Sequence, residues 1–318
     1  MKVVTATSPG HVGRPNEDFV GDVPGVVVLL DGAGIPGTEA ICRHGVAWYS
    51  HTLGDTLLGR LAREVGTDLV AALADSIEEV AGRHRHTCDL DNPSSPQSTV
   101  AIVRFDDDRA YFLVLADAYV VLDMVDAPPQ VVTDAREVSV RRDCTAALHG
   151  LPAGTPEYEH ARQSVIHALQ ARRNQPGGYW IAKDDPYAAT QAVTGSVPRG
   201  RLNSAALLSN GASRIVDPYQ LAGWPTVLEL ARTRGPGEIL RQTGAAERET
   251  LAHFRTSTIP TMRQSPTANR QHDSGSETDP SRGLCGPART ATHGAGCAPW
   301  GNTCWRDAAI ASNSSHLG

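Results

Sequence analysis

Acidic and amide side chains stand in this sequence at points where apolar segments end. Asp31, Asp117 and Asn210 each follow such a segment. An acidic pair, Glu17 and Asp18, precedes the first segment. Side chains at the ends of neighbouring strands converge, and carboxylates held close together repel one another. A divalent cation relieves that repulsion, and ligands made of oxygen alone favour Mg²⁺ or Mn²⁺ over Zn²⁺. The pattern therefore leaves two interpretations open: a metal site, and ordinary turn residues, which are the commoner reason for Asp and Asn at strand ends.

The segments that would position these side chains have strand-like and helix-like patterns. The continuous apolar run at residues 26–30 is typical of a buried strand, and further strands are predicted at 98–105, 110–115, 119–124 and 205–208. Apolar residues at helical spacing predict helices at 39–63, 67–84, 156–173 and 225–243. The order lacks the strict strand–helix alternation of a parallel doubly wound sheet. We therefore predict an α+β fold, a four-layer αββα sandwich of two mainly antiparallel sheets flanked by helices.

The composition changes near residue 255. From 255 to 318 the chain is rich in Ser, Thr, Pro and Gly and contains no Val. Such a stretch buries too little apolar area to offset the entropy lost on ordering. We predict one folded domain over residues 1–254 and a disordered, low-complexity tail over 255–318, with no strand after residue 254.

Charge and hydropathy exclude several classes of protein. The formal net charge of -6 and a sequence pI of about 6.0 argue against a nucleic-acid or membrane-surface partner. No apolar run approaches the ~20 residues of a membrane span, and the first residues lack a signal-peptide pattern. We expect a cytoplasmic protein whose six cysteines are thiols. Only Lys2 and Lys183 are lysines among 29 basic residues, a bias typical of GC-rich bacterial coding.

Four motifs, in order along residues 1–217, resemble those of the metal-dependent type 2C Ser/Thr protein phosphatases. In that family an Arg and a Glu-Asp pair precede a strand ending in Asp-Gly-x-Gly, and Ser-Thr, Gly-Asp-Ser and Ser-Asp-Gly motifs follow. The matching residues here are Arg14 with Glu17-Asp18, Asp31-Gly32-Ala33-Gly34, Ser98-Thr99, Ala116-Asp117-Ala118 and Ser209-Asn210-Gly211. The sequence of residues 42–49 is similar to sequences of an actinobacterial branch of the family.

The resemblance implies a phosphatase that acts in signalling on a phosphorylated protein, with Mn²⁺ or Mg²⁺ as cofactor. Two ions, and an outer third, would activate a water that attacks phosphorus in line. The residues carried over by position have these roles: Asp31 bridges the metals, Gly32 offers its carbonyl, Glu17 and Asp18 complete the second metal's shell, Asp117 serves the outer site, and Arg14 holds phosphate. Asn210 takes the place of a family metal ligand.

This sequence also departs from the family pattern. Asn210 stands where the family has Asp, and an amide oxygen brings a metal no charge. Arg14 is one residue closer to Glu17 than in the commoner pattern, and the family's last metal-binding Asp, ahead of a final strand, has no counterpart before residue 254. These departures imply a phosphatase of weakened activity. The alternative is a non-catalytic binding or regulatory module that recognises a phosphorylated partner.

Two other motifs point to different chemistry. The segment 32–37 matches a dinucleotide-binding fingerprint, which would make the protein an oxidoreductase. Against this, Asp31 would repel a pyrophosphate and Pro36 removes an amide donor. Residues 84–89 contain two His and one Cys but fit no recurring zinc spacing, so a polar helix end is expected there. A further candidate zinc set, with irregular spacing, consists of Cys285, His293, Cys297 and Cys304.

Overall fold

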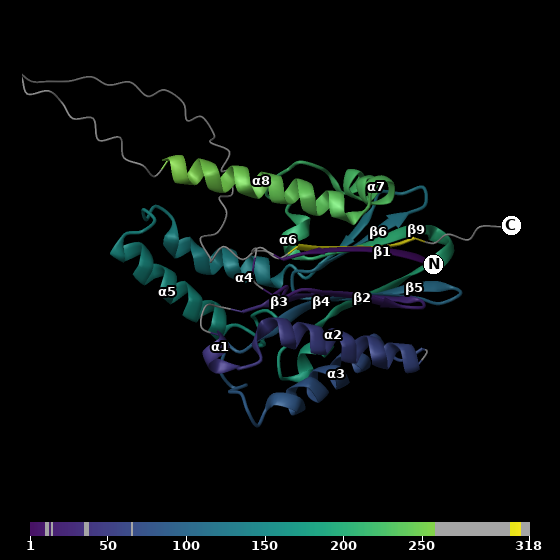
Figure 1. Cartoon of the computed structure of the whole chain (residues 1–318), viewed down its shortest axis with the longest axis horizontal. Coiled ribbons are helices and arrows are strands. Elements are labelled where there is room, and N and C mark those ends of the chain that lie inside the picture. Colours follow the sequence, from purple (N-terminus) through teal and green to yellow (C-terminus); the bar gives the residue numbers. More distant parts are fainter. Residues whose placement is uncertain (10–12, 14, 35–37, 65, 258–305, 313–318) are drawn as a thin grey trace, which may run out of the picture.

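The chain folds into four layers, with two sheets face to face and helices outside each sheet (Figure 1). The structure is a computed structural model, and it describes all residues except 10–12, 14, 35–37, 65, 258–305 and 313–318. Neighbouring strands within both sheets pair antiparallel. The predicted αββα sandwich is therefore confirmed. The antiparallel pairing differs from the parallel sheet of the dinucleotide-binding fold, and residues 35–37 of the matching segment lie outside the described residues.

Within the described residues, each sheet has five strands. The first has the order β1-β10-β9-β6-β7, with β1 Lys2–Ser8, β10 Arg306–Ser312, β9 Leu202–Leu208, β6 Tyr119–Met124 and β7 Gln130–Val132. The second has the order β2-β3-β4-β5-β8, with β2 Phe19–Val23, β3 Val26–Ala33, β4 Gln97–Phe105, β5 Arg109–Leu115 and β8 Val193–Pro198.

The helices form the outer layers and one end of the molecule (Figure 1). The second sheet is covered by α2 Gly45–Arg63 and α3 Leu69–His84, and the first by α7 Trp224–Arg234 and α8 Pro236–Ser257. At the end of the sandwich lie α1 Thr38–Ile41, α4 Arg136–Thr145, α5 Pro156–Ala171 and α6 Asn210–Ser213. Short 3₁₀ turns occupy Ala146–Leu148, Pro186–Gln191 and Arg199–Arg201.

Strand β3 shows why its sequence is a continuous apolar run. Val28 and Leu30 pack in the core beneath α2 and α3, whereas Val27 and Leu29 pack in the core between the two sheets. Successive side chains of a strand point to opposite faces, so a strand covered on both faces has no polar alternation. The apolar run thus places Asp31, near the end of β3, at the edge of two cores.

Two predicted helices are interrupted in the structure. The helix expected at 39–63 is divided into α1 and α2, and Gly45 at the start of α2 has a φ of 77°. The helix expected at 225–243 is divided into α7 and α8 at Gly235, whose φ is 80°. Glycine adopts this left-handed conformation without steric cost, and the proline that follows Gly235 favours a new helix start. Helix α4 was not predicted, because few of its residues are apolar.

The expectation of no strand after residue 254 is wrong. Residues Arg306–Ser312 form β10, which lies between β1 and β9, and α8 extends to Ser257. A short Ala- and Ile-containing segment has no strong strand signal of its own, and pairing on both edges supplies its backbone hydrogen bonds. The rest of the predicted tail, including the candidate zinc set at 285–304, lies outside the described residues. Among the described residues, no helix has the length and apolar character that crossing a membrane requires.

Candidate active site at the strand ends

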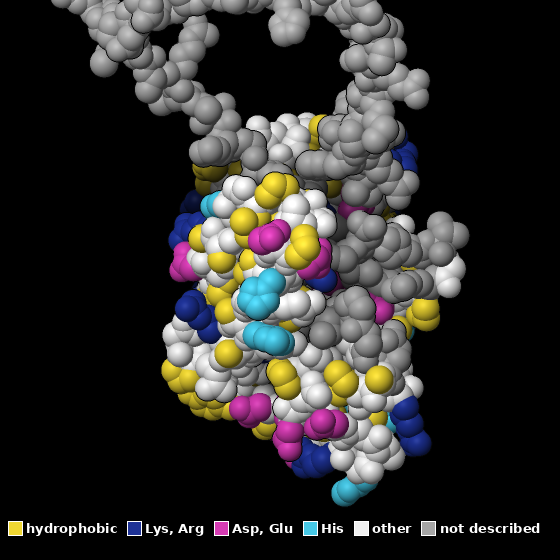
Figure 2. Space-filling view, turned by 90° about the vertical axis from the view of Figure 1, so that its left-hand side faces the viewer, with side chains coloured by type: hydrophobic (Ala, Val, Ile, Leu, Met, Phe, Trp, Pro, Cys, Tyr) yellow, Lys and Arg dark blue, Asp and Glu magenta, His cyan; other side chains and the backbone are white. Residues whose placement is uncertain are grey.

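A cavity of about 390 Å³ lies where the strands of both sheets end beside α4 and α5. Its lining includes four of the predicted site residues, Asp31, Gly32, Asp117 and Asn210. Figure 2 views the molecule from this end, where acidic, basic and histidine side chains lie on the described surface. The structure therefore brings together side chains that are far apart in the sequence.

Asp31 enters the cavity from β3. Its register partner on β4 is Thr99, and the Ser98 hydroxyl donates to the Asp31 carbonyl oxygen over 3.0 Å. Two further polar atoms of β4, Oε1 of Gln97 and Oγ1 of Thr99, are buried and have no hydrogen-bond partner among the described residues. Both residues line the same cavity. Buried polar atoms of this kind normally have partners, so the cavity is suited to water or an ion.

Asp117 and Asn210 face each other because of strand register. Tyr119, the first residue of β6, pairs with Leu208, the last residue of β9. Asp117 before β6 and Asn210 after β9 therefore lie at the same end of these two antiparallel strands. Nδ2 of Asn210 donates a hydrogen bond to Oδ2 of Asp117 over 2.8 Å. Ala116, before Asp117, has a φ of 65° in the turn between β5 and β6. The family that the sequence resembles has Gly at this turn position.

The carboxyl group of Asp117 is held in an environment that disfavours its charge. Burial raises the pKa of Asp117 well above its usual range, and the negative charges of Glu137 and Asp31 raise it further. Arg141 acts in the opposite direction. A hard divalent cation relieves this kind of arrangement, in which neighbouring negative charges raise the pKa of a carboxyl group. The donor set of the cavity, which consists of carboxylate, amide and hydroxyl oxygens, fits Mg²⁺ or Mn²⁺.

Helix α4 adds an ion pair that the sequence did not predict. Arg141 donates a hydrogen bond to Oε1 of Glu137, one helical turn earlier, and both residues line the cavity. Burial acts to lower the pKa of Arg141, but the charges of Glu137 and Asp117 outweigh it and raise that pKa. The opposite charges at i and i+4 were the available signal, but helix α4 itself was not recognised.

The Glu17-Asp18 segment lies against Gly32. A Cβ at Gly32 would come within 2.2 Å of the Glu17 carbonyl oxygen, so only glycine allows this approach. The same carbonyl accepts a hydrogen bond from Ser50 Oγ, and the Asp18 carbonyl lies 2.9 Å from Nε2 of His51. The cavity lining does not include Glu17 or Asp18. Their place in a metal shell stays a prediction, and Arg14 lies outside the described residues.

Strand β10 brings another acidic residue to this end of the sandwich. Asp307 pairs in register with Thr7 of β1, and the next residue, Ala308, pairs with Leu208 of β9. Because Leu208 lies two residues before Asn210, Asp307 occupies the same end of the sheet as Asn210. The sequence signal was an acid directly ahead of an Ala- and Ile-containing stretch, which is too weak to identify without the pairing.

No family model matches the chain, and no curated protein matches it. Comparison with solved structures finds bacterial Ser/Thr phosphatases. The catalytic domain of PstP, solved with two manganese ions, is 18% identical with a TM-score of 0.49, over 77% of this chain and 90% of that chain. Stp1 from Staphylococcus aureus is 13% identical with a TM-score of 0.48, over 77% and 90%. The PPM phosphatase MsPP from Mycobacterium smegmatis, solved with cacodylate, is 12% identical with a TM-score of 0.48, over 98% and 97%.

Proposed function

We propose that the chain is a metal-dependent Ser/Thr protein phosphatase, which hydrolyses phosphomonoesters of a phosphorylated protein with Mn²⁺ or Mg²⁺. The observation that carries this proposal is the placement of Asp31 and Asp117 in one cavity, where the charge of Asp31 helps to raise the pKa of Asp117. The free thiols of Cys42, Cys88 and Cys144 accord with a reducing compartment, and we include a cytoplasmic location in the proposal.

Within this proposal the chain's own groups hold and orient the reactants. Asp31 and the Gly32 carbonyl would hold the paired ions, Asp117 and Asn210 would hold an outer ion, and Glu17 and Asp18 would complete the shell. When bound, the ions supply an acidified water as nucleophile and neutralise the phosphoryl oxygens. Arg141 offers a guanidinium in the cavity wall, which orients phosphate by charge-assisted hydrogen bonds in the role also assigned to Arg14.

The amide of Asn210 sets the expected strength of the outer site. A carboxylate there would add a negative charge to the ion's shell, whereas the amide adds only a neutral oxygen. Its Nδ2 already donates to Asp117, which leaves Oδ1 as the ligand atom. We therefore include weakened metal binding and weakened turnover in the proposal.

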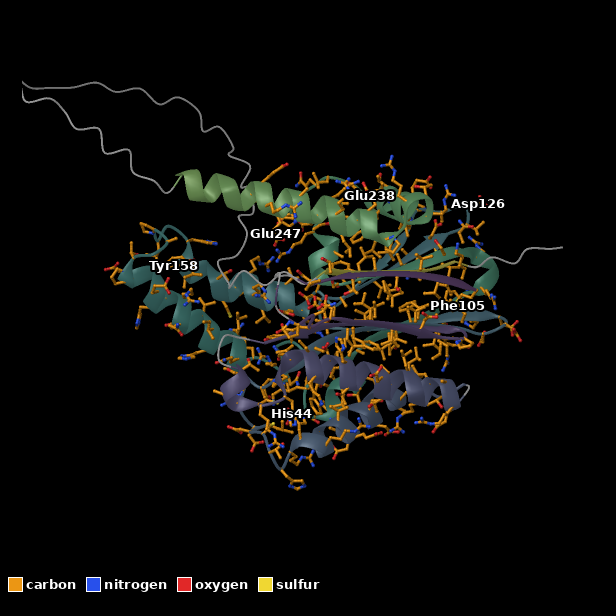
Figure 3. The ribbon with its side chains drawn as sticks, viewed as in Figure 1. His44, Phe105, Asp126, Tyr158, Glu238 and Glu247 are labelled. Atoms are coloured by element: carbon orange, nitrogen blue, oxygen red, sulfur yellow. The ribbon has the colours of Figure 1, made fainter. Side chains whose placement is uncertain are left out.

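The test is hydrolysis of p-nitrophenyl phosphate with and without Mn²⁺. Wild type is expected to turn over only with metal, and Asp31→Asn to lose on the order of 100-fold or more in rate. Asp126→Asn is the matched control, because Asp126 is exposed and lies at the opposite end of the sandwich from α5 (Figure 3). Equal turnover by wild type and Asp31→Asn would refute the proposal.

The second candidate, a non-catalytic module, is favoured by the neutral Asn210 in place of an acid. It predicts that the chain binds a phosphopeptide without hydrolysing it, with or without Mn²⁺. Fluorescence anisotropy on a labelled phosphoserine peptide, followed by phosphate release in the same sample, separates the two functions.

A further inference from the structure

Two cysteines and two histidines meet on the far side of the second sheet from the candidate active site. Each of Cys42, His44, His84 and Cys88 offers one ligand atom, and these four atoms all lie within 4.8 Å of one another. Figure 3 labels His44, which lies in the outer layer formed by α1, α2 and α3. None of the four residues lines the active-site cavity.

The distances between these atoms match the edges of a metal tetrahedron. Cys42 Sγ lies 3.8 Å from Nδ1 of His44 and 3.6 Å from Nδ1 of His84, and Cys88 Sγ lies 3.3 Å from Nδ1 of His44. A tetrahedral Zn²⁺ with its usual bond lengths to sulfur and nitrogen separates these ligands by about 3.6 Å. Little movement is needed to place one ion among the four atoms.

Two local turns present the ligands in pairs. Cys42 and His44 lie in the turn between α1 and α2, where the Gly45 amide donates to the Cys42 carbonyl over 3.1 Å. His84 ends α3, and the Cys88 amide donates to the His84 carbonyl over 3.0 Å. The pairs have the form Cys-x-His and His-x-x-x-Cys. An ion bound to both would tie the start of α2 to the end of α3.

Two of the four ligands are buried, and the other two, His44 and Cys88, are half-buried. Cys42 is fully buried and His84 is 2% exposed. The Trp48 ring stacks on His44 with centroids 4.4 Å apart and also contacts His84. Nε2 of His84 has no hydrogen-bond partner among the described residues. The polar contact that the structure gives this buried ring is the one between its Nδ1 and the Cys42 thiol. Four protein ligands without an open position are typical of structural rather than catalytic zinc.

We propose that Cys42, His44, His84 and Cys88 bind one Zn²⁺ ion in a structural site separate from the active site. Binding converts the two thiols to thiolates and releases their protons, and the two negative charges neutralise the ion. Sulfur and imidazole ligands select Zn²⁺ over the Mn²⁺ or Mg²⁺ of the oxygen-lined cavity. The helix end predicted at residues 84–89 is present, because α3 ends at His84. The sequence did not connect it with residues 42–44, which only the packing of α2 against α3 brings near.

The direct test is zinc content and zinc titration of the full chain, purified under reducing conditions, against a competing chelator. Wild type is expected to bind one Zn²⁺ per chain. Cys88→Ser and His44→Asn are expected to weaken the affinity by about 100-fold or more. Cys144→Ser is the matched control, because Cys144 is also a free, half-buried cysteine but lies on α4. Zinc binding by Cys88→Ser and His44→Asn as tight as that of wild type would overturn the proposal.

Two further variants locate the ion. Asp31→Asn is expected to keep the zinc, because the proposed site is independent of the cavity. A triple variant, Cys285→Ser with Cys297→Ser and Cys304→Ser, is expected to keep it as well. Loss of zinc from either one would place the ion elsewhere and overturn the proposal.

A spectroscopic measurement on wild type serves if a ligand variant fails to fold. Co²⁺ added to the zinc-free chain should give the intense visible absorption of a tetrahedral site together with thiolate-to-cobalt charge transfer, and one equivalent of Zn²⁺ should abolish both. A Co²⁺ spectrum without charge transfer, or a Cys42–Cys88 disulfide in protein that binds no zinc after reduction, would contradict the proposal.

Discussion

Asn210 donates a hydrogen bond from Nδ2 to Oδ2 of Asp117 over 2.8 Å and thereby joins the ends of β6 and β9. The amide stabilises the half-buried carboxyl group with a neutral donor, where a second carboxylate would repel it. Without metal, the pair is therefore better matched as Asn and Asp than as two acids.

The change Asn210→Asp tests this arrangement. We expect the Mn²⁺ dissociation constant to fall about tenfold, because a carboxylate adds charge to the ligand set. Without metal the variant should unfold at a lower temperature than wild type, since two acids then face each other. Calorimetric titration and thermal unfolding, each with and without Mn²⁺, measure the two effects. Mn²⁺ binding no tighter than in wild type would show that residue 210 is not a ligand.

The raised pKa of Asp117 predicts how stability depends on pH in the metal-free chain. The folded state keeps a proton that the unfolded state releases near pH 4, so the folded state binds more protons above that pH. The free energy of unfolding should therefore decrease as the pH rises from about 4 through the raised pKa of Asp117. Urea unfolding of wild type and Asp117→Asn over this range isolates the contribution. Parallel pH profiles for the two proteins would contradict the shift.

Arg141 is predicted to bind the phosphoryl group of the substrate. Arg141→Gln should raise KM for p-nitrophenyl phosphate by about tenfold, which corresponds to the loss of one charge-assisted hydrogen bond. Arg142→Gln is the matched control, because the Arg142 side chain is 77% exposed and does not line the cavity. Initial-rate kinetics at saturating Mn²⁺ give the comparison. Equal KM values for the two variants would exclude this role.

Gly32 is predicted to be intolerant of any side chain. Gly32→Ala places a Cβ within 2.2 Å of the Glu17 carbonyl oxygen, so the Glu17-Asp18 segment must move away from Asp31. We expect loss of Mn²⁺-dependent activity and a lower unfolding temperature. Gly82→Ala in α3 is the control, because no heavy atom lies within 4 Å of its added Cβ, and alanine should stabilise the helix by about 0.5–1 kcal/mol. Activity of Gly32→Ala equal to that of wild type would contradict the close approach.

Ala116 is predicted to hold the turn before Asp117 at a conformational cost. Its φ of 65° is in the left-handed region, which costs a residue with a Cβ about 1–2 kcal/mol. Ala116→Gly should therefore stabilise the chain by about 0.5–1 kcal/mol despite the entropy that glycine loses on folding. Ala118→Gly, two residues later at a buried position with no positive φ, should destabilise it. Denaturant unfolding gives the free energy of unfolding of both variants. A lower value than wild type for Ala116→Gly as well as for Ala118→Gly would contradict the turn geometry.

Local pattern predicted the layers of the fold, and local pattern together with the family resemblance predicted the residues of the candidate site. The apolar run of β3 is recognisable because both of its faces are buried, and this also explains why the polar residue Asp31 marks its end. Asp117 and Asn210 were found in the same way, at the ends of β5 and β9. These patterns of apolar and polar residues reflect which side chains are buried, and each pattern lies within a few neighbouring residues of the sequence.

Only the tertiary structure decided the features that depend on pairing between distant segments. Strand β10 forms between β1 and β9 although its composition predicts no strand, because the edges of both neighbours supply hydrogen-bond partners. Glu137 and Arg141 reach the cavity on a helix with little apolar pattern, and Cys42 meets His84 only through the packing of α2 against α3. The burial pattern of a segment can be predicted from its own sequence. These contacts each join two distant segments, and they form only when the sheets and helices pack together.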